Sequence, residues 1–414
     1  MKTNRQIYLD QTVIKWMALL LNSMVKLAGK LFPKNHDLSR PFQTIAVCKF
    51  RGLGSIVQAT PLLQTLRRQY PDATILFVTT PANKQMLGKI PLVDEVVLLN
   101  DKTIGSLLRG IFPFVWTLFR KKIDLYIDLE VYSNFSSVIT ALTNAQNRFG
   151  YYLKESNYRM GIYTHMMYYN SAVPISEVYM QWSRLLQVRE EIQDLYEFET
   201  SAAAFPKADG LTATDRYLVI NPNASDLRIE RRWPAEGFVQ LIQLLLQQYP
   251  QCRILLVGAP NERDYVTTIY DQVVHERVLN MAGRTSMEEL ICLLKHAAVV
   301  ITNDTGPMHL AFAVKAPTVA LFGPCSPRQY GINANAAIVY KNVYCSPCVH
   351  EFRIPPCLGN NQCMKQITVP EVLTQVNAML DGHVPVNAFN DPRSYSGEEE
   401  GKPIALGMIR RKTY

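Results

Sequence analysis

The chain has 414 residues, of which 48% are apolar, a length that exceeds one hydrophobic core and suits two domains. The formal net charge of +8 is uneven, because residues 1–42 carry a net +5 and residues 391–414 a net +1, which leaves +2 for the body. A nucleic-acid-binding protein would show a basic stripe on its folded body, so this distribution argues against nucleic acid as a partner.

Residues 1–42 form an N-terminal arm whose longest uncharged run has ten residues. A membrane-spanning helix needs about 20 apolar residues, and no small-residue cleavage site follows the run, so neither a spanning helix nor a signal peptide is expected. Apolar residues recur at helical spacing between 13 and 31, and Lys15, Lys26 and Lys30 fall off the main apolar face. This pattern predicts an amphipathic helix, which either lies on an anionic membrane surface or packs on the protein's own core.

The body begins after Pro41, and its first half alternates segments of strand and helix character. The stretch from about 103 to 121 predicts a long helix, and Thr60 and Pro61 suit the cap and first position of another. This alternation predicts a parallel, doubly wound sheet. The strands are predicted at 44–50, 73–79, 95–99 and 124–129.

The same alternation restarts near residue 216, after a segment at 196–215 that is the expected linker. The sequence therefore predicts two Rossmann-like α/β domains, at 43–200 and 215–383. Beyond about 384 the chain is rich in Pro, Asn, Gly and Glu, which predicts a mobile tail. The second set of strands is predicted at 216–221, 253–257, 299–302 and 318–322, with helices at 238–248, 287–296 and from 307.

Candidate sites lie in the loops after the predicted strands, because open α/β sheets bind ligands at that edge. From Thr302 to His309 the chain passes from a strand end through a turn into a helix, whose first N–H groups and dipole suit a phosphate. Gly306 allows close backbone approach, Thr305 adds a hydroxyl, and His309 can face the same anion. Asp304 either caps the helix or orients the ligand, and a capped helix without a ligand is the alternative.

A second polar loop includes Asn223 and Ser225 and is followed by three arginines. Leaving-group catalysis on a nucleoside diphosphate needs a fixed cation, and Arg231 is the expected one, since a guanidinium matches phosphate oxygens without any metal. A solvated basic loop is the alternative. Gly258 and Glu262 follow the next strand, where a glycine and a carboxylate can hold a ribose hydroxyl.

Four of the eight cysteines cluster late in the chain, at Cys345, Cys348, Cys357 and Cys363. Without an export signal a disulfide framework is not expected. The first pair has zinc-ligand spacing, but the second pair is too widely spaced for a zinc ribbon. A structural metal and a thiol-rich loop without metal both stay open, and no metal is assigned.

Together these segments resemble glycosyltransferase family 9, the lipopolysaccharide heptosyltransferase family, over roughly residues 43–380. The most specific piece is Asn303-Asp-Thr-Gly-Pro-Met-His-Leu-Ala311. The other matching pieces are Gly52-Leu-Gly-Ser55, Ala59-Thr-Pro61, Leu66-Arg67, Asn221-Pro-Asn-Ala-Ser225, Arg231-Arg-Trp-Pro234, Ala282-Gly-Arg-Thr-Ser286, Ala320-Leu-Phe-Gly-Pro324 and Cys345-Ser-Pro-Cys348.

The resemblance implies a GT-B fold, with an N-terminal acceptor domain and a C-terminal nucleotide domain facing across a cleft. It implies an inverting, metal-independent glycosyltransferase that needs no cofactor beyond its nucleotide-sugar donor, often ADP-heptose. The implied acceptor is a lipopolysaccharide core or related envelope glycolipid, so the protein would be peripheral at the cytoplasmic face of the membrane. The donor-site residues that the resemblance implies are Asn223, Arg231, Asp304, Thr305, Gly306 and His309.

One position departs from the family pattern, which places an Asp after Leu-Gly in the first loop as the candidate general base. Here that position is Ser55, whose hydroxyl has far too high a pKa to take a proton unassisted. Glu130, with Asp128 second, is the expected substitute, because both stand at the end of the fourth predicted strand; both would otherwise cap the following helix. The missing base also leaves a non-catalytic nucleotide-sugar-binding protein, and a GT-B epimerase, as alternatives.

Overall fold

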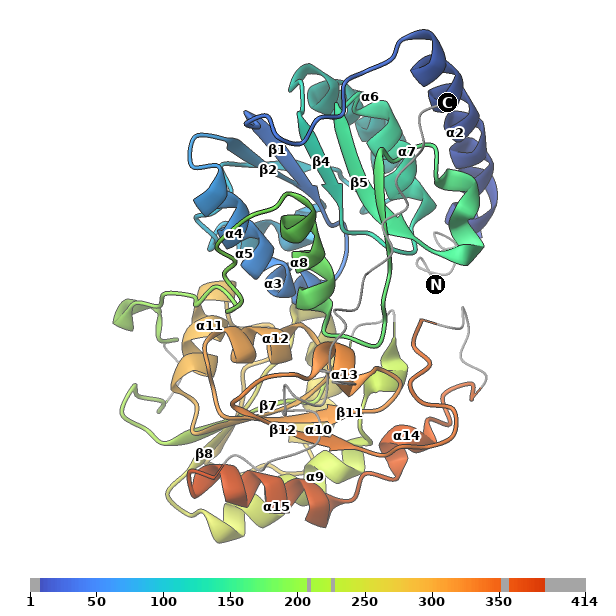
Figure 1. Ribbon diagram of the computed structural model, residues 1–414. Helices are drawn as coiled ribbons and strands as arrows, with labels where there is room; N and C mark the ends of the chain where they lie inside the picture. Colours follow the sequence, from blue (N-terminus) through green and yellow to red (C-terminus); the bar gives the residue numbers. More distant parts are fainter. Residues whose placement is uncertain (1–7, 207–209, 225–227, 351–356, 384–414) are drawn as a thin grey trace, which may run out of the picture. The chain divides into compact units, whose positions relative to one another are not determined.

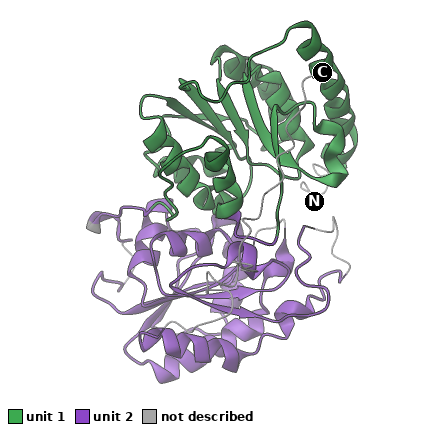
Figure 2. Ribbon diagram, in the orientation of Figure 1, with its two compact units in different colours: residues 1–171, 176–196, 398–414 green, residues 172–175, 197–397 purple. Residues whose placement is uncertain are grey.

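The computed structural model describes residues 8–206, 210–224, 228–350 and 357–383. They form two compact units, one holding residues up to 171 and 176–196, the other 172–175 and the residues from 197 onward (Figure 2). The chain therefore changes unit at the start of the expected linker, and the arm belongs to the first unit instead of standing apart from it.

The first unit is built on a six-stranded sheet with the strand order β3-β2-β1-β4-β5-β6 (Figure 1). All neighbouring strands are parallel. The first four strands match the predicted ones, whereas the last two were not predicted. The strands are β1 (Thr44–Cys48), β2 (Thr74–Thr79), β3 (Glu95–Leu98), β4 (Leu125–Asp128), β5 (Asn147–Tyr152) and β6 (His165–Tyr168).

Helices cover both faces of this sheet. The chain runs from β1 outward through β2 and β3, then from β4 outward through β5 and β6 in the opposite direction. Because such crossovers are right-handed, the connections after β3 and β4 place α6 and α7 on the same face. The helices are α2 (Lys15–Leu31), after a π-helical turn (Asp10–Ile14), α3 (Leu53–Gln58), α4 (Thr60–Gln69), α5 (Lys84–Leu87), α6 (Ile104–Arg120), α7 (Asn134–Leu142) and α8 (Ile175–Leu185).

The arm helix α2 packs along α7. Ala18 is fully buried in a cluster with Val138 and Ile162, and Asn22 accepts a hydrogen bond from the backbone N–H of Gly161. The inner face of α2 thus packs on the protein's own core, while its outer face stays exposed. No helix in the described part of the chain is both long and apolar enough to cross a membrane.

The turn before α2 ties the arm to the start of α7. The Asp10 carboxylate accepts hydrogen bonds from the backbone N–H groups of Asn134 at 3.0 Å and Phe135 at 2.7 Å. The first N–H groups of a helix have no partner within the helix, so Asp10 supplies one from a distant part of the sequence.

The second unit repeats the doubly wound plan, with the strand order β12-β11-β10-β7-β8-β9 and parallel neighbours. Its strands are β7 (Tyr217–Asn221), β8 (Arg253–Leu256), β9 (Val278–Asn280), β10 (Val299–Asn303), β11 (Thr318–Phe322) and β12 (Ala336–Tyr340). Its helices are α9 (Ala235–Gln248), α10 (Arg263–Tyr270), α11 (Met287–His296), α12 (Gly306–Ala313), α13 (Pro327–Tyr330), α14 (Gln362–Lys365) and α15 (Val369–Leu380). Short 3₁₀ turns lie at Pro81–Asn83, Lys154–Arg159, Ala202–Ala204, Ile229–Arg231 and Pro260–Glu262.

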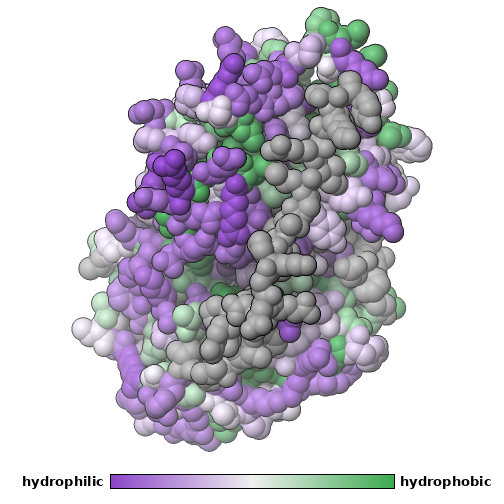
Figure 3. Space-filling view, in the orientation of Figure 1, coloured by the Kyte–Doolittle hydropathy of each residue, from purple (hydrophilic) through white to green (hydrophobic). Residues whose placement is uncertain are grey.

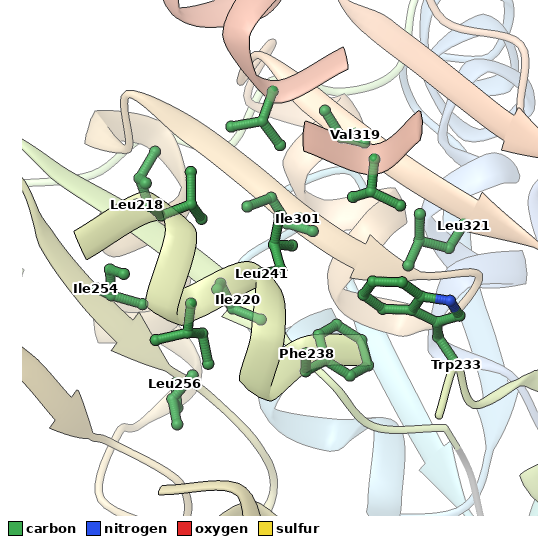
Figure 4. Close-up of a cluster of buried hydrophobic side chains, with 14 of the residues drawn as sticks. Leu218, Ile220, Trp233, Phe238, Leu241, Ile254, Leu256, Ile301, Val319 and Leu321 are labelled. Atoms are coloured by element: carbon green, nitrogen blue, oxygen red, sulfur yellow. The ribbon is translucent and has the colours of Figure 1, made fainter. Parts of the chain in front are cut away.

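The core of the second unit anchors the C-terminal end of the loop between β7 and α9, which carries Arg228, Arg231 and Arg232. Trp233 is buried beside Phe238 of α9, with ring centroids 4.9 Å apart, and both lie against the sheet (Figure 4). The indole Nε1 of Trp233 donates to the carbonyl of Ile367 at 2.9 Å. A Cβ at Gly237 would come within 2.8 Å of the indole ring, so this glycine makes room for Trp233. Trp233 is therefore fixed in the core, and this fixes the backbone position from which Arg231 and Arg232 extend.

Candidate active site

Each sheet contains one point where the strand order reverses direction. In the second unit β7, β8 and β9 extend to one side and β10, β11 and β12 to the other, so this topological switch point lies between β7 and β10. Ligands of open α/β sheets bind beyond the C-terminal ends of the two strands at such a point. The two loops that the sequence singled out, after Asn221 and after Asn303, both start there.

A network of buried amides joins these two loops. The Nδ2 of Asn221 donates to Thr302 Oγ1 at 3.0 Å and to Thr305 Oγ1 at 2.8 Å. The Nδ2 of Asn223 donates to Asn221 Oδ1 at 3.2 Å and to the carbonyl of Val257 at 3.0 Å. The structure thus brings the predicted residues Asn223 and Thr305 together through Asn221, to which the sequence assigned no role.

Asn303 is a second positioning residue, and the sequence assigned it no role of its own. Its Nδ2 donates to the carbonyls of Pro222 at 2.9 Å and Asn223 at 3.1 Å, and its Oδ1 accepts from the backbone N–H of Trp233 at 3.1 Å. One side chain at the end of β10 therefore fixes both ends of the loop that carries Arg231.

Arg231 and Asp304 meet at this point. The Nη1 of Arg231 lies 3.5 Å from Asp304 Oδ2 and donates to the Asp304 carbonyl at 3.3 Å. The Asp304 carboxyl is almost completely buried, whereas the Arg231 side chain is partly exposed. The guanidinium is therefore held from one side and keeps further N–H groups for a ligand.

Buried polar atoms without a partner gather in the same loops. Among the described residues, eight buried side-chain nitrogen or oxygen atoms have no hydrogen-bond partner, and five of them belong to this region. Proteins leave few buried polar atoms unsatisfied, so their concentration here indicates a site built to receive a polar ligand. The five atoms are Asn223 Oδ1, Glu230 Oε2, Arg231 Nε, Arg232 Nε and Asp304 Oδ2, the last of which has the ion pair with Arg231 but no hydrogen bond.

His309 lies in the first turns of α12, which begins at Gly306 after Thr305 at the N-cap. Burial lowers the pKa of His309 to about 4, with Arg231 adding to the effect and Asp304 opposing it. The imidazole is therefore neutral near pH 7. It can take part in hydrogen bonding to a phosphate, while Arg231 is the fixed positive charge of this site.

The three remaining predicted donor residues are Gly258, Glu262 and Ser225. A Cβ at Gly258 would approach Asn223 Nδ2 within 2.6 Å, so this glycine leaves space for that amide. The carboxylate of Glu262 accepts from the backbone N–H of Ala259 at 2.8 Å and caps the turn that follows. Ribose binding by Gly258 and Glu262 stays a prediction. Ser225 lies outside the described residues.

The first unit has its own switch point, between β1 and β4. Glu130, just after β4, holds the loop that follows β1: its Oε2 lies 3.0 Å from Lys49 Nζ, and its Oε1 accepts from the N–H groups of Phe50 at 2.9 Å and Arg51 at 3.1 Å. The Glu130 side chain is 13% exposed. Glu130 is thus tied to the loop that ends in Ser55, and the ion pair with Lys49 was not predicted.

Asp128 is less accessible to solvent than Glu130. Its carboxyl is fully buried, accepts from the Tyr163 hydroxyl at 2.7 Å and from the Glu130 N–H at 3.0 Å, and burial raises its pKa to about 6. Such a group lies beyond the reach of a substrate hydroxyl, so this placement does not support Asp128 as the general base. Neither carboxyl caps α7, whose first N–H groups bond to Asp10 and Ser133.

The cysteine cluster contains no disulfide, since all eight cysteines are free thiols. Within the described ranges, no group of three or more His, Cys, Asp or Glu residues is placed to bind a metal ion. Cys363 is buried and Cys345 exposed, so the four thiols of the cluster differ in their access to solvent.

Comparison with known proteins places the chain in a family. Residues 113–357 match the family described as "Glycosyltransferase family 9 (heptosyltransferase)". The chain is 26% identical to lipooligosaccharide heptosyltransferase 2 of Campylobacter jejuni over 345 residues, which cover 79% of this chain and 95% of that protein. It is 26% identical to lipopolysaccharide heptosyltransferase 3 of Escherichia coli K12 over 288 residues, 65% of this chain and 79% of that protein.

The fold agrees with these matches. The structure of Escherichia coli ADP-heptose lps heptosyltransferase II superimposes with a TM-score of 0.66 at 20% identity, covering 82% of this chain and 99% of that one. The two Rossmann-like units are those of the GT-B fold, as predicted. The family match covers more than half of the sequence, so the chain belongs to glycosyltransferase family 9, the heptosyltransferases.

Proposed function

We propose that this glycosyltransferase moves heptose from ADP-heptose to a sugar of the lipopolysaccharide core or a related envelope glycolipid, with inversion and without a metal ion. The names of its relatives support the donor and acceptor classes. The observation that carries the proposal is Arg231 beside Asp304, at the switch point where unsatisfied buried polar atoms gather.

The donor diphosphate would bind between Arg231 and the start of α12. Departure of ADP places negative charge on its terminal phosphate, and a fixed guanidinium stabilises that charge most where water is excluded. The dipole at the start of α12 acts in the same direction. Arg231 thus supplies the cation that a metal ion supplies in other transferases, which supports the metal-independent mechanism.

The acceptor would react by a single displacement. Its hydroxyl oxygen forms a bond to the anomeric carbon of heptose, the bond from that carbon to the ADP oxygen breaks, and the hydroxyl proton passes to a base. Attack from the face opposite the leaving group inverts the configuration. Glu130 is the proposed base, because its Oε2 keeps a lone pair beside Lys49 and its side chain is partly exposed.

The acceptor's lipid would bring the enzyme to the inner face of the cytoplasmic membrane. The outer side of α2 supports this contact, since Trp16, Leu20 and Leu27 are exposed on a helix that also carries Lys26 and Lys30. In Figure 3 hydrophobic surface is visible at the upper right, where α2 lies in Figure 1. An amphipathic helix with basic residues binds anionic membrane surfaces in this way.

Substitution of Arg231 tests the proposal. We expect Arg231→Ala to lower kcat for heptose transfer by about 10²-fold or more, as removal of a single preorganised donor does elsewhere. Arg263→Ala, which removes an exposed arginine of the same unit, is the control and should transfer at the wild-type rate. Equal rates for wild type and Arg231→Ala would refute the assigned role.

The family pattern has an Asp, the candidate base, at the position of Ser55. A second candidate function is therefore that of a protein that binds nucleotide-sugar without transferring it. The same assay separates the two. A protein that binds ADP-heptose but forms no product with any lipopolysaccharide-type acceptor would favour the binding function.

A further inference from the structure

The outer side of α6 carries a row of exposed apolar side chains. They are spaced by four, four and three residues, which places them on one face of the helix. Phe114 and Leu118, on the opposite side, are buried against the sheet. Single exposed apolar residues are ordinary, but such a row marks an interaction surface. This α6 face consists of Leu108, Phe112, Trp116 and Phe119, exposed by 69%, 75%, 52% and 44%.

Basic side chains surround the α6 face. Residues 102–123 contain five Lys or Arg and no Asp or Glu. Lys121 pairs with Glu95 at 2.5 Å, whereas Arg109, Arg120 and Lys122 are exposed. An apolar row within a cationic rim is complementary to an anionic lipid surface, where the apolar groups enter the interface and the cations meet headgroups. A tryptophan in the row fits the same environment.

The position of α6 relative to α2 agrees with a shared lipid surface. Both helices pack against α7, within one compact unit, and α6, α7 and α2 follow one another in Figure 1. The outer side of α2 is also apolar, with Trp16 71% exposed, and Lys30 is exposed in its last turn. The first unit therefore presents two apolar-basic helices on either side of α7.

We propose that the α6 face is a second membrane-binding surface, which docks on anionic phospholipid together with the outer side of α2. The proposal deepens the proposed function by naming how the enzyme reaches a lipid-borne acceptor, and it rests on that function only for the nature of the acceptor. Two separated contacts fix the orientation of the unit on the membrane, whereas one helix alone would leave it free to rotate about that helix.

Tryptophan fluorescence can follow each helix separately. The chain has four tryptophans, of which Trp182 and Trp233 are buried, while Trp16 lies on α2 and Trp116 on α6. In the full-length Trp16→Phe variant, Trp116 is the exposed tryptophan. We expect its emission to shift to the blue, and to be quenched by brominated lipid, on vesicles in which about a third of the phosphatidylcholine is replaced by phosphatidylglycerol. An unchanged emission would overturn the proposal.

Vesicle co-sedimentation measures what the α6 face contributes. We expect Leu108→Ser/Phe112→Ser to bind the anionic vesicles about ten-fold more weakly than wild type, because two large apolar groups no longer leave water. The control Val274→Ser/Leu358→Ser removes two exposed apolar side chains of the other unit and should bind as wild type does. Equal loss in both variants, or in neither, would contradict the assignment.

Two further readouts separate the proposal from its alternatives. With core oligosaccharide freed of its lipid, wild type and Leu108→Ser/Phe112→Ser should transfer heptose equally; failure of both would contradict the proposed function and leave the vesicle result standing. Light scattering gives the oligomeric state. If the substitutions converted a dimer to a monomer and left vesicle binding unchanged, the α6 face would bind a second copy of the chain and the proposal would be wrong.

Discussion

The Glu130 carboxylate holds the loop after β1 and is also the proposed general base. Its three donors, Lys49 and the N–H groups of Phe50 and Arg51, hold the loop that ends in Ser55. The same fixed geometry would suit a base, since proton transfer depends first on placement within hydrogen-bond reach. The two roles can be separated because glutamine can keep the two backbone hydrogen bonds but cannot take the proton.

We therefore expect Glu130→Gln to lower kcat by about 10²-fold or more, with ADP affinity unchanged. Lys49→Gln breaks the same ion pair but keeps the carboxylate, so it should cost less activity. If Lys49→Gln lost as much as Glu130→Gln, Glu130 would be a positioning residue and not the base.

Burial of His309 makes the free energy of unfolding decrease as the pH falls. Its pKa is about 4 in the folded chain, because of burial, whereas an unfolded histidine titrates near about 6.5. Between these values the unfolded chain binds more protons. The contribution of His309 to stability is thus complete above about pH 6.5 and is lost as the pH falls toward about 4.

The variant His309→Gln removes this dependence. The unfolding free energy of His309→Gln relative to wild type should rise by up to about 3 kcal/mol as the pH falls from about 7 to about 4. Denaturant titrations across this range give the difference. The raised pKa of Asp128 acts with the opposite sign but is common to both proteins and cancels. A difference that stays constant with pH would contradict the burial of His309.

Contacts at three positions join the described part of the N-terminal arm to the rest of the first unit. Asp10 caps α7, Ala18 enters a buried cluster, and Asn22 bonds to Gly161, so α2 is part of the first unit. A Cβ at Gly161 would collide with Asn22 Oδ1, which shows how closely the two segments approach. The arm thus has one face for the protein and one for solvent or lipid.

Removal of the Asp10 carboxylate tests this docking. We expect Asp10→Ala to lower the free energy of unfolding by about 1 kcal/mol, the usual cost of losing a helix cap. Hydrogen exchange should speed up at the amides of Asn134 and Phe135, which lose their acceptor. Asp37→Ala, which changes an exposed carboxylate between α2 and β1, serves as the control. Unchanged exchange at both amides would show that the arm does not cap α7.

Most elements follow from local patterns, and the exceptions have physical causes. The runs that become β1, β4, β7 and β10 are apolar and bounded by turn residues, so they were predicted. The unpredicted β5 opens on Asn147 and Arg148, and β6 is an edge strand that opens on His165, so neither shows an apolar run. The edge strands β9 and β12 of the second unit were also not predicted; β9 has only three residues, whereas β12 is an apolar run.

The loops of the candidate site could be predicted from the sequence, but the contacts that join them could not. Loops at strand ends could be identified, because the fold places them at the switch points. The Lys49–Glu130 pair and the Asp10 cap join segments 81 and 124 residues apart, and no local pattern encodes such contacts. The unsatisfied atoms around Arg231 likewise follow from burial, which depends on the whole packed unit.

At the scale of the whole molecule, donor binding should be visible as stabilisation. A ligand at about 100 times its Kd adds about 2.7 kcal/mol to the folded state, a shift of several degrees in Tm. We expect that shift with ADP and not with UDP, GDP or CMP, and expect it to be lost in Arg231→Ala. A shift with UDP or GDP alone would keep the fold and the site but change the donor class.

The reaction product distinguishes inverting, metal-independent heptose transfer from its alternatives. Full-length protein would be incubated with ADP-heptose and a heptose-deficient lipopolysaccharide acceptor, with and without EDTA, and the product examined by mass spectrometry and NMR. We expect one added heptose, with anomeric configuration opposite to that of the donor and a yield insensitive to EDTA. Retained configuration, dependence on a metal ion, or heptose released only to water would contradict the proposed function.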